Sequence, residues 1–530
     1  MNKRSWILAV AAALALCTGA FAAEKVFVYN LGVEPRTIDP ALNNAVDGST
    51  IINNIFEGLV RISFNDSPEP GLAEKWDVSE DGLTWTFHLR EGLKWSDGKP
   101  LTAEHVRYGY MRVLDPEVAS PYAYLAFGIL NGEEFYNGKC KREDVGLKAL
   151  DDRTLEVKLA YKDPLLLDHF SYHIFFPARP DVVEANPRGW TSDPKTCVGN
   201  GPFYLSGWNH NAEMELTKNP YYWDAKNVKI DKVRVVMIAD PNTSLAAFKS
   251  GKIDFTPRMP AMQIPMLLKS GVASPRFELG TSFSVFNITK PPFDNPLVRK
   301  AFALAVDRTA LTEKVTMSGQ VPAEAFIPLG IPGPSDDKDF RAASGKSYFS
   351  VHAQPEEARK LLAEAGYPNG KGFPKITYKY NTNEGNKNIA EALQAMWKQN
   401  LGIEVDLYNE EWKVFINTRN QKDYQIARHS YLVDFFDAGS LLDLFVTDSP
   451  ENVTGYSNAK YDELMHASRK EMDREKRIKM MLEAEDIVLK DVPLIPLYYN
   501  GSAYLLNKRI KGLYLSPRKW DFFRGIEIVQ

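Results

Sequence analysis

The sequence predicts a mixed α and β fold arranged in several lobes. Residues 84–90 (TWTFHLR) and 154–159 (TLEVKL) alternate polar and apolar side chains, as half-buried strands do. Other segments have apolar residues at helical spacing behind residues that cap helices. The length of 530 residues suggests about three or four folding units, or fewer large ones. Periodicity therefore indicates an α/β or α+β architecture and goes no further.

The first 22 residues have the order of a secretory signal peptide. A basic stretch (2–4) precedes an apolar run (6–16) and small residues that end in AFA (20–22). The run is too short to span a bilayer, which argues against a membrane anchor. Cys17 suggests a lipoprotein, but a leucine precedes it where lipoprotein signals need a small residue. We expect cleavage after residue 22 and export of a chain without a transmembrane helix.

The charge balance excludes one class of function. The chain has 64 Lys and Arg against 68 Asp and Glu, a net charge of −4, and a pI of about 6.2. This balance argues against nucleic acid or an anionic membrane as the main partner.

Two cysteines, Cys140 and Cys197, remain after cleavage. In an oxidising compartment two thiols plausibly pair, and their separation of 57 positions forbids neither outcome. We expect a disulfide between them, with a structural role.

Helix signals concentrate in the second half of the chain. An Asn-Pro pair at 295–296 supplies an N-cap and a first helical residue. A second helix is expected over 355–365, which a glycine follows. Residues 459–490 have the pattern of a polar-faced helical pair that leads to an apolar strand at 492–497. The segment 327–334 (IPLGIPGP) is expected to form neither helix nor sheet.

Catalytic motifs are mostly absent. The chain has no G-x-S-x-G and no H-E-x-x-H, and the GKS at 345–347 lacks the leading glycine of a P-loop. His169 and His173 are spaced for one helix face, but two ligands are too few for zinc, so we interpret them as histidines in or near a core. Asp434 and Asp437 form a possible acid/base pair without a partner motif. We therefore expect neither a metal nor a cofactor.

Residues 427–437 (ARHSYLVDFFD) suggest binding instead. An extended segment that ends in an acidic residue beside aromatics offers backbone hydrogen bonds and a partner for a cation. The alternative, which the residues alone favour, is a core strand that leads into a solvated acidic turn.

An ordered series of motifs favours the binding interpretation over the core-strand alternative. The motifs extend over nearly the whole mature chain, and each is weak alone. They are 34–40 (EPRTIDP), 54–59 (NIFEGL), 70–76 (PGLAEKW), 94–98 (KWSDG), 199–203 (GNGPF), 218–223 (KNPYYW), 250–254 (SGKID), 298–301 (VRKA), 306–308 (VDR), 411–413 (EWK) and 431–437 (YLVDFFD). Together they resemble the extracellular solute-binding proteins that serve ABC peptide importers.

The resemblance implies an α/β, two-lobed periplasmic-binding-protein fold, with hinged lobes that close over a buried ligand and with an extra subdomain. The expected divisions are 24–56, 182–279 and 501–530 for lobe I, 57–181 for the extra subdomain, and 280–500 for lobe II.

The resemblance also implies a site. Asp434 matches the acidic residue that pairs with the α-ammonium of a peptide, and a buried ammonium needs such a partner. Arg428 is a candidate for binding the carboxylate of a short peptide. The other matched positions are His429, Ser430 and Tyr431 on the strand that bonds the peptide backbone, Asn44, Ala45 and Val46 on the facing segment, and Trp412, Arg419 and Tyr122 along the cleft.

This chain departs from its relatives near the site. Gly280 and Leu432 stand at the positions of a disulfide that some relatives carry. Tyr431 replaces a common tryptophan, and Ala438 replaces a common proline. These changes bear on the length and selectivity of the peptide more than on the ammonium site.

The implied function is that of a periplasmic, monomeric binding protein that captures peptides and delivers them to a permease in the inner membrane, without catalysis. Within the same family, the alternative ligands are a murein peptide, a dipeptide or a metal chelate. The alternative from another class is a secreted hydrolase that uses Asp434 and Asp437.

Overall fold

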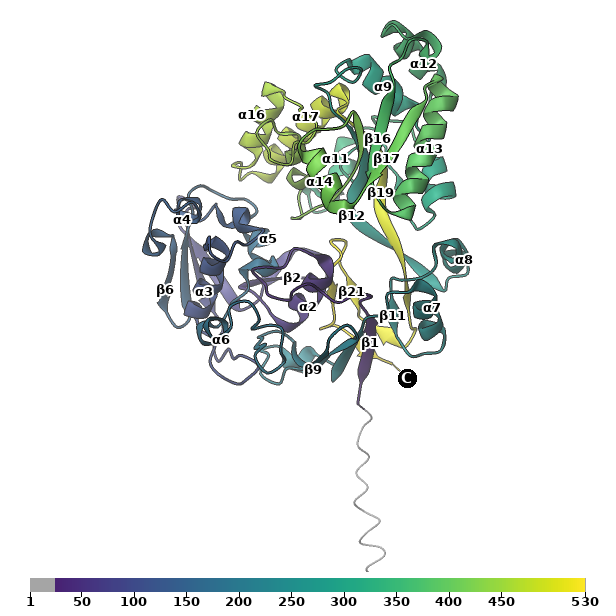
Figure 1. Ribbon diagram of the computed structural model, residues 1–530. Helices are drawn as coiled ribbons and strands as arrows, with labels where there is room; N and C mark the ends of the chain where they lie inside the picture. The colour runs from purple at the N-terminus through teal and green to yellow at the C-terminus, as the bar shows by residue number, and fades with distance from the viewer. Residues whose placement is uncertain (1–23, 530) are drawn as a thin grey trace, which may run out of the picture.

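The computed structural model describes residues 24–529 and places them in two bodies (Figure 1). The upper body packs around a hydrophobic core drawn from Leu279 to Tyr498. The lower body packs around a core drawn from Phe27 to Phe255 and from Ile510 to Ile526, so it contains both ends of the described chain. The predicted signal peptide lies outside the described residues. No helix among residues 24–529 has the length and apolar character needed to cross a membrane.

One eleven-stranded sheet runs through both bodies. Its two longest strands, β12 and β19, pair antiparallel from Ala273↔Leu505 below to Val285↔Leu494 above, and they connect the bodies (Figure 1). Their register shifts between Phe277 and Thr281, where a bulge bends the strands. In sheet order the strands are β17 (Val405–Glu410), β16 (Ile376–Asn381), β18 (Ile426–Leu432), β12 (Ala273–Phe286), β19 (Leu494–Leu506), β11 (Phe255–Thr256), β1 (Val26–Asn30), β10 (Lys232–Val236), β9 (Glu213–Lys218) and β8 (Phe203–Asn209), and β13 (Val321–Pro322) also pairs with β19.

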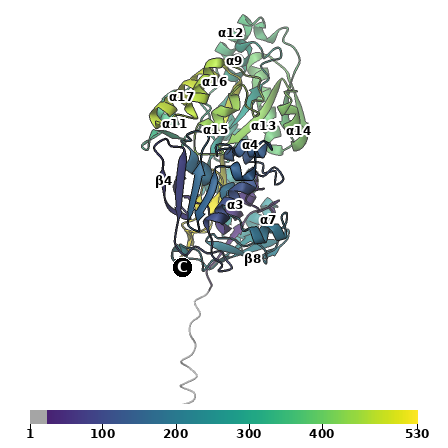
Figure 2. The same cartoon turned by 90° about the vertical axis from the view of Figure 1, so that its left-hand side faces the viewer.

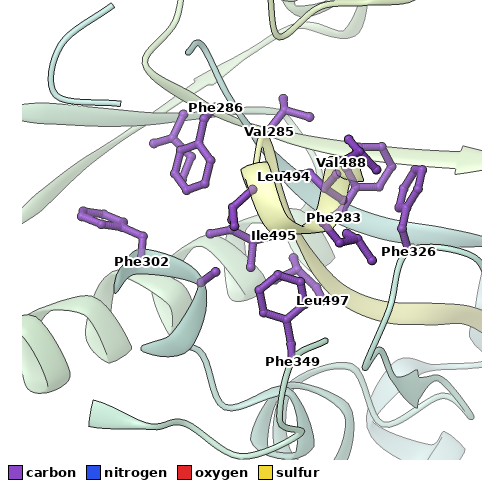
Figure 3. Close-up of a cluster of buried hydrophobic side chains, with 14 of the residues drawn as sticks. Phe283, Val285, Phe286, Phe302, Phe326, Phe349, Val488, Leu494, Ile495 and Leu497 are labelled. Carbon is purple, nitrogen blue, oxygen red and sulfur yellow. The ribbon is translucent and has the colours of Figure 1, made fainter. Parts of the chain in front are cut away.

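The upper body surrounds its half of β12 and β19 with helices. Figure 3 shows Phe283 and Val285 of β12 beside Leu494 and Ile495 of β19, with Phe302 of α9 packed against them. The main helices are α9 (Pro296–Leu304), α10 (Arg308–Ala310), α11 (Phe340–Ser344), α12 (Pro355–Glu364), α13 (Glu384–Leu401), α14 (Trp412–Asn420), α15 (Gly439–Leu442), α16 (Ala459–Ser468) and α17 (Arg474–Asp491).

The helix signals of the sequence are confirmed. Asn295 caps α9 because its side chain accepts the Leu297 N–H at 2.9 Å. Helix α12 occupies the expected segment, and Gly366 beyond it has a φ of +95°, which favours glycine. Helices α16 and α17 form the predicted pair and lead into β19.

The lower body carries a separate four-stranded antiparallel sheet, covered by helix α3 and seen from the front in Figure 2. Both predicted strands are neighbours in it, with Thr84 opposite Lys158. The sheet order is β4 (Ala73–Val78), β5 (Thr84–Leu89), β7 (Thr154–Lys158) and β6 (Leu147–Asp151). The helices of the lower body are α2 (Val46–Ile55), α3 (Ala103–Leu114), α4 (Gly132–Tyr136), α5 (Leu166–Phe170), α6 (Pro180–Ala185), α7 (Pro241–Lys249) and α8 (Ile264–Lys269). Short two-stranded sheets pair β2 (Val60–Ile62) with β3 (Pro68–Pro70), β20 (Ile510–Lys511) with β23 (Glu527–Ile528), and β21 (Tyr514–Leu515) with β22 (Asp521–Phe522).

The loop prediction for 327–334 is wrong at its end. Strand β14 (Pro332–Ser335) pairs with β15 (Lys338–Asp339) in a two-stranded sheet. Proline is tolerated in a strand of this kind because an edge position does not need its missing N–H in the ladder.

The predicted disulfide is also wrong, because both cysteines are free. The Cys140 Sγ lies 3.6 Å from the Asn131 carbonyl oxygen, in the segment after α4. Cys197 is buried in the lower core, where burial and the nearby Asp39 carboxylate raise the pKa of its thiol to about 12. Each thiol has its own surroundings, and neither contacts the other.

We expect the mature chain to contain two free thiols without any treatment with a reducing agent. In native protein a maleimide label should react with the partly exposed Cys140 alone, because Cys197 is buried and strongly protonated. After unfolding without reductant, mass spectrometry should find both cysteines labelled. An unfolded, unreduced chain that takes up no label would contradict the structure.

Candidate ligand-binding site

Strand β18 has one edge that is only partly paired with a neighbouring strand. Along its whole length it pairs with β12, with Leu432 opposite Gly280 and Ser430 opposite Ser282. On its other edge β16 pairs only at Ile426 and Ala427. Within residues 24–529, no strand pairs with that edge from residue 428 to 432, so its backbone groups are available to an extended ligand. Gly280 and Leu432, the two positions that the resemblance singled out, directly face each other on β12 and β18.

The side chains of β18 hold the strand in place. The His429 ring stacks on Phe283 at 4.6 Å and is 3% exposed. Its burial, together with the charges of Arg419 and Arg428, lowers the pKa of this histidine well below its usual value, so the ring is neutral. The Ser430 Oγ accepts a hydrogen bond from the Ser282 hydroxyl at 3.1 Å. The strand is therefore anchored through its side chains while its free edge consists of backbone.

Asp434 follows the strand and has no cationic partner. Its Oδ2 accepts a hydrogen bond from the Tyr431 hydroxyl at 2.8 Å, and its own N–H donates to the Ser440 Oγ at 2.8 Å. Desolvation, which outweighs the Tyr431 bond, raises the pKa of Asp434 to about 6, and the Glu451 carboxylate adds to the effect. No ion pair joins Asp434 to a basic side chain among the described residues.

Tyrosines from the lower body surround this carboxylate. Burial raises the pKa of Tyr122, Tyr124 and Tyr172, and the Asp434 charge raises each of them further. The Tyr122 and Tyr172 rings pack edge to face at 5.3 Å. A carboxylate beside aromatic faces is suited to an ammonium group. Tyr122 is a residue expected here from the sequence, whereas Tyr124 and Tyr172 are not; the two-residue spacing of Tyr122 and Tyr124 was the available signal.

Two arginines, Arg428 on β18 and Arg419 on α14, form no ion pair within the described part of the chain, although the Glu451 carboxylate is close enough to raise the pKa of Arg419. No ion pair to Arg428 or Arg419 exists among residues 24–529. Burial lowers the pKa of Arg428 and lowers that of Arg419 to about 10. The Arg428 charge also contributes to lowering the pKa of Arg419, so the two guanidinium groups lie near each other. The Arg419 Nε is buried without a hydrogen-bond partner. These cations are suited to an anionic group of a ligand.

The structure brings together only some of the predicted residues. Asp434, Tyr431 and Tyr122 form one group, and Arg419 and Arg428 another. Trp412 is half-exposed at the start of α14, and no hydrogen bond connects it to either group in the part of the chain that the structure describes. Residues Asn44, Ala45 and Val46 lie exposed at the start of α2, where Arg36 donates to the Asn44 Oδ1 at 2.7 Å.

The histidine pair and the second carboxylate considered from the sequence each have protein partners. His169 bonds to Asp163 at 2.9 Å, and His173 is buried against the Asn43 carbonyl at 3.2 Å. Residues 24–529 contain no cluster of three or more His, Cys, Asp or Glu that could hold a metal ion. The Asp437 carboxylate pairs with Arg477 at 2.7 Å, so the two carboxylates of the possible acid/base pair have different surroundings.

Two cavities lie between the bodies, on either side of the Asp434 loop. One, of about 570 Å³, is lined by Asp168, Phe436 and Ile331. The other, of about 520 Å³, is lined by Tyr124, Phe435 and Met465. Asp434 lines neither cavity, but its two following neighbours do.

We expect the Asp434 carboxyl to titrate at about pH 6 in the ligand-free protein, as measured by ¹³C NMR. Tyr431→Phe should raise that midpoint, because the hydroxyl stabilises the ionised carboxylate. Tyr408→Phe, at an exposed position, is the control and should leave it unchanged. An Asp434 midpoint near the ordinary value of about 3.9 would contradict the desolvation argument.

Comparisons with known proteins agree with this architecture. The bacterial extracellular solute-binding proteins, family 5, match residues 67–452 through the family's middle region. The dipeptide-binding protein DppE of Bacillus subtilis is 38% identical over 497 residues, covering 93% of this chain and 90% of its own. The solved MppA periplasmic murein tripeptide binding protein, in its unliganded open form, has a TM-score of 0.81 at 30% identity, with coverage of 96% and 98%.

A second solved structure, Haemophilus influenzae OppA in complex with RPPGFSPFR, has a TM-score of 0.75 at 32% identity and covers 96% of this chain and 99% of its own. The homologues are solute-binding proteins, and their two-domain fold is that of the present structure. This chain belongs to the bacterial extracellular solute-binding proteins, family 5.

Proposed function

We propose that this protein captures peptides in the periplasm and delivers them to the permease of an ABC importer. The observation that carries the proposal is the free edge of β18, which runs from residue 428 to the unpaired carboxylate of Asp434. An extended peptide can add to this edge as a strand, and its main chain then supplies most of the hydrogen bonds. Because such pairing does not depend on side chains, it suits broad specificity.

The charges near the edge support recognition of both peptide ends. Asp434 binds the α-ammonium, with Tyr122 beside it. The guanidinium of Arg428, six residues before Asp434 and without an ion-pair partner among residues 24–529, serves the carboxylate of a short peptide. In this proposal His429, Ser430 and Tyr431 contribute backbone groups, residues 44–46 face them from the other lobe, and Trp412 and Arg419 line the cleft.

The proposal includes a hinge motion. The boundaries 24–56, 182–279 and 501–530 for lobe I and 280–500 for lobe II are supported by two separate hydrophobic cores, of which one lies almost entirely within 280–500. A peptide that contacts both lobes favours the closed state, because it binds that state better than the open one. The closed, monomeric protein then docks to the permease.

Two narrower classes of peptide ligand are alternatives within the family, since DppE is a dipeptide-binding protein and MppA a murein tripeptide binding protein. For each of these peptide classes, we propose that this protein recognises the free α-ammonium through Asp434. A hydrolase is disfavoured because Asp437 is engaged by Arg477, which leaves Asp434 without a second carboxylate.

Mass spectrometry of the contents of protein purified without denaturation tests the proposal directly. We expect short peptides with free N-termini, released intact on unfolding. Recovery of a bile acid, a metal chelate or cleaved products instead of intact peptides would contradict the peptide-capture function.

Asp434→Ala should weaken binding of a recovered peptide by about 3–5 kcal/mol, because it leaves the buried ammonium unpaired. N-acetylation of the same peptide should weaken binding to the wild-type protein for the same reason, and calorimetry measures both effects. Asp406→Ala, which removes an exposed carboxylate paired with Lys375, is the matched control. Equal affinity of the wild-type protein for the free and acetylated peptide would refute the ammonium assignment.

A further inference from the structure

The loop that carries Asp434 reaches across to the opposite body. The Phe436 backbone N–H donates to the Asp168 Oδ2 at 2.9 Å, and Asp168 lies on α5 of the lower body. The Phe435 ring meets the His169 ring edge on at 5.3 Å. The two residues that follow the ammonium-binding carboxylate are therefore held by the lobe that does not contain it.

Asp168 is buried beside a cation of its own body. The Arg518 Nη1 lies 3.3 Å from the Asp168 Oδ1, and the two side chains are 1% and 7% exposed. The Arg518 Nη2 also donates to the Asp66 carbonyl at 3.3 Å, and its guanidinium lies 5.8 Å from the centre of the Phe436 ring. The Arg518 charge stabilises the buried Asp168 carboxylate, and the Asp168 Oδ2 is the oxygen that accepts the Phe436 N–H.

The ends of the loop are fixed to the upper body. The Val433 N–H donates to the Leu279 carbonyl at 2.9 Å, the Asp434 N–H donates to Ser440, and Asp437 pairs with Arg477. Between these anchors, the bond from Phe436 to Asp168 fixes the middle of the loop. The cavities on either side leave space into which the loop can relax when this bond is absent.

We infer that Asp168 is a positioning residue for Asp434, which it orients across the lobes through the Phe436 amide. This inference rests on the proposed function and adds a residue to it. Asp168 contacts no ligand; its carboxylate holds the loop so that the Asp434 carboxylate faces Tyr122 and the incoming ammonium.

Asp168→Ala removes the acceptor and should lower selectivity for a free N-terminus rather than binding in general. Asp168→Asn keeps an oxygen acceptor of the same shape for the Phe436 N–H and removes the charge that pairs with Arg518. We therefore expect Asn to rescue the selectivity that Ala loses. A purely structural role would lower the melting temperature of both variants and leave the selectivity unchanged.

The probe is an equimolar library of tripeptides to pentapeptides with free N-termini, mixed with the same library N-acetylated. Mass spectrometry of the captured fraction gives the ratio of free to acetylated peptides. We expect Asp168→Ala to lower the wild-type ratio about tenfold, the effect of losing one hydrogen bond to a charged acceptor. Asp168→Asn and the surface control Asp406→Asn should retain most of it.

The outcomes separate the two proposals. A wild-type ratio near one refutes the ammonium assignment and with it the positioning role, whereas capture of no library peptide at all contradicts the peptide-capture function itself. If the wild-type ratio is well above one and Asp168→Ala keeps it, only the positioning role is overturned. The positioning role is also overturned if Asp168→Asn loses as much selectivity as Asp168→Ala. If Asp168→Ala does not fold, Phe436→Pro replaces it, because proline removes the same amide proton and leaves the Asp168–Arg518 pair in place.

Discussion

The antiparallel pairing of β12 with β19 is the constraint on which the rest of the structure depends. One hydrogen-bonded ladder runs from Ala273↔Leu505 in the lower body to Val285↔Leu494 in the upper body and joins two separate cores. The irregularity after Phe277 interrupts that ladder between the bodies, so bending concentrates there. Because β18 pairs with the upper half of β12 and ends opposite Gly280, the site lies beside the bend.

Charges distinguish the scaffold from the site. In the scaffold, the buried Arg308 donates to backbone carbonyls such as that of Pro496 at 2.7 Å. Several other buried scaffold charges are paired with an opposite charge, as in Asp39 with Arg112 at 2.8 Å and Arg276 with Asp521 at 2.7 Å. Asp434 and Arg428 are largely desolvated and have no such partner among the described residues. An unpaired charge costs folding free energy, so its presence on one strand and the turn after it is best explained by a ligand that supplies the missing partners.

The sequence predicted what short-range interactions decide. The cap at Asn295 and the alternation of 84–90 depend on neighbours a few residues away, and both predictions are confirmed. The strand at 332–335 and the free state of Cys140 and Cys197 depend on what the folded chain brings near them, so local patterns could not reveal them. Asp434 was found through an ordered series of motifs, whereas Tyr172 and Asp168 become visible only when the lower body meets the Asp434 loop.

The placement of these groups links recognition to lobe movement. The carboxylate of Asp434 belongs to the upper body, while Tyr122, Tyr172 and Asp168 belong to the lower one. In the proposed site, a cation at Asp434 interacts with both bodies at once, and these interactions are complete only when the bodies are close. Because a ligand shifts a conformational equilibrium by its difference in affinity for the two states, a cation shared in this way favours closure. Under the same proposal, a peptide whose ammonium is blocked lacks that difference in affinity at its N-terminal end, even where its backbone pairs with β18.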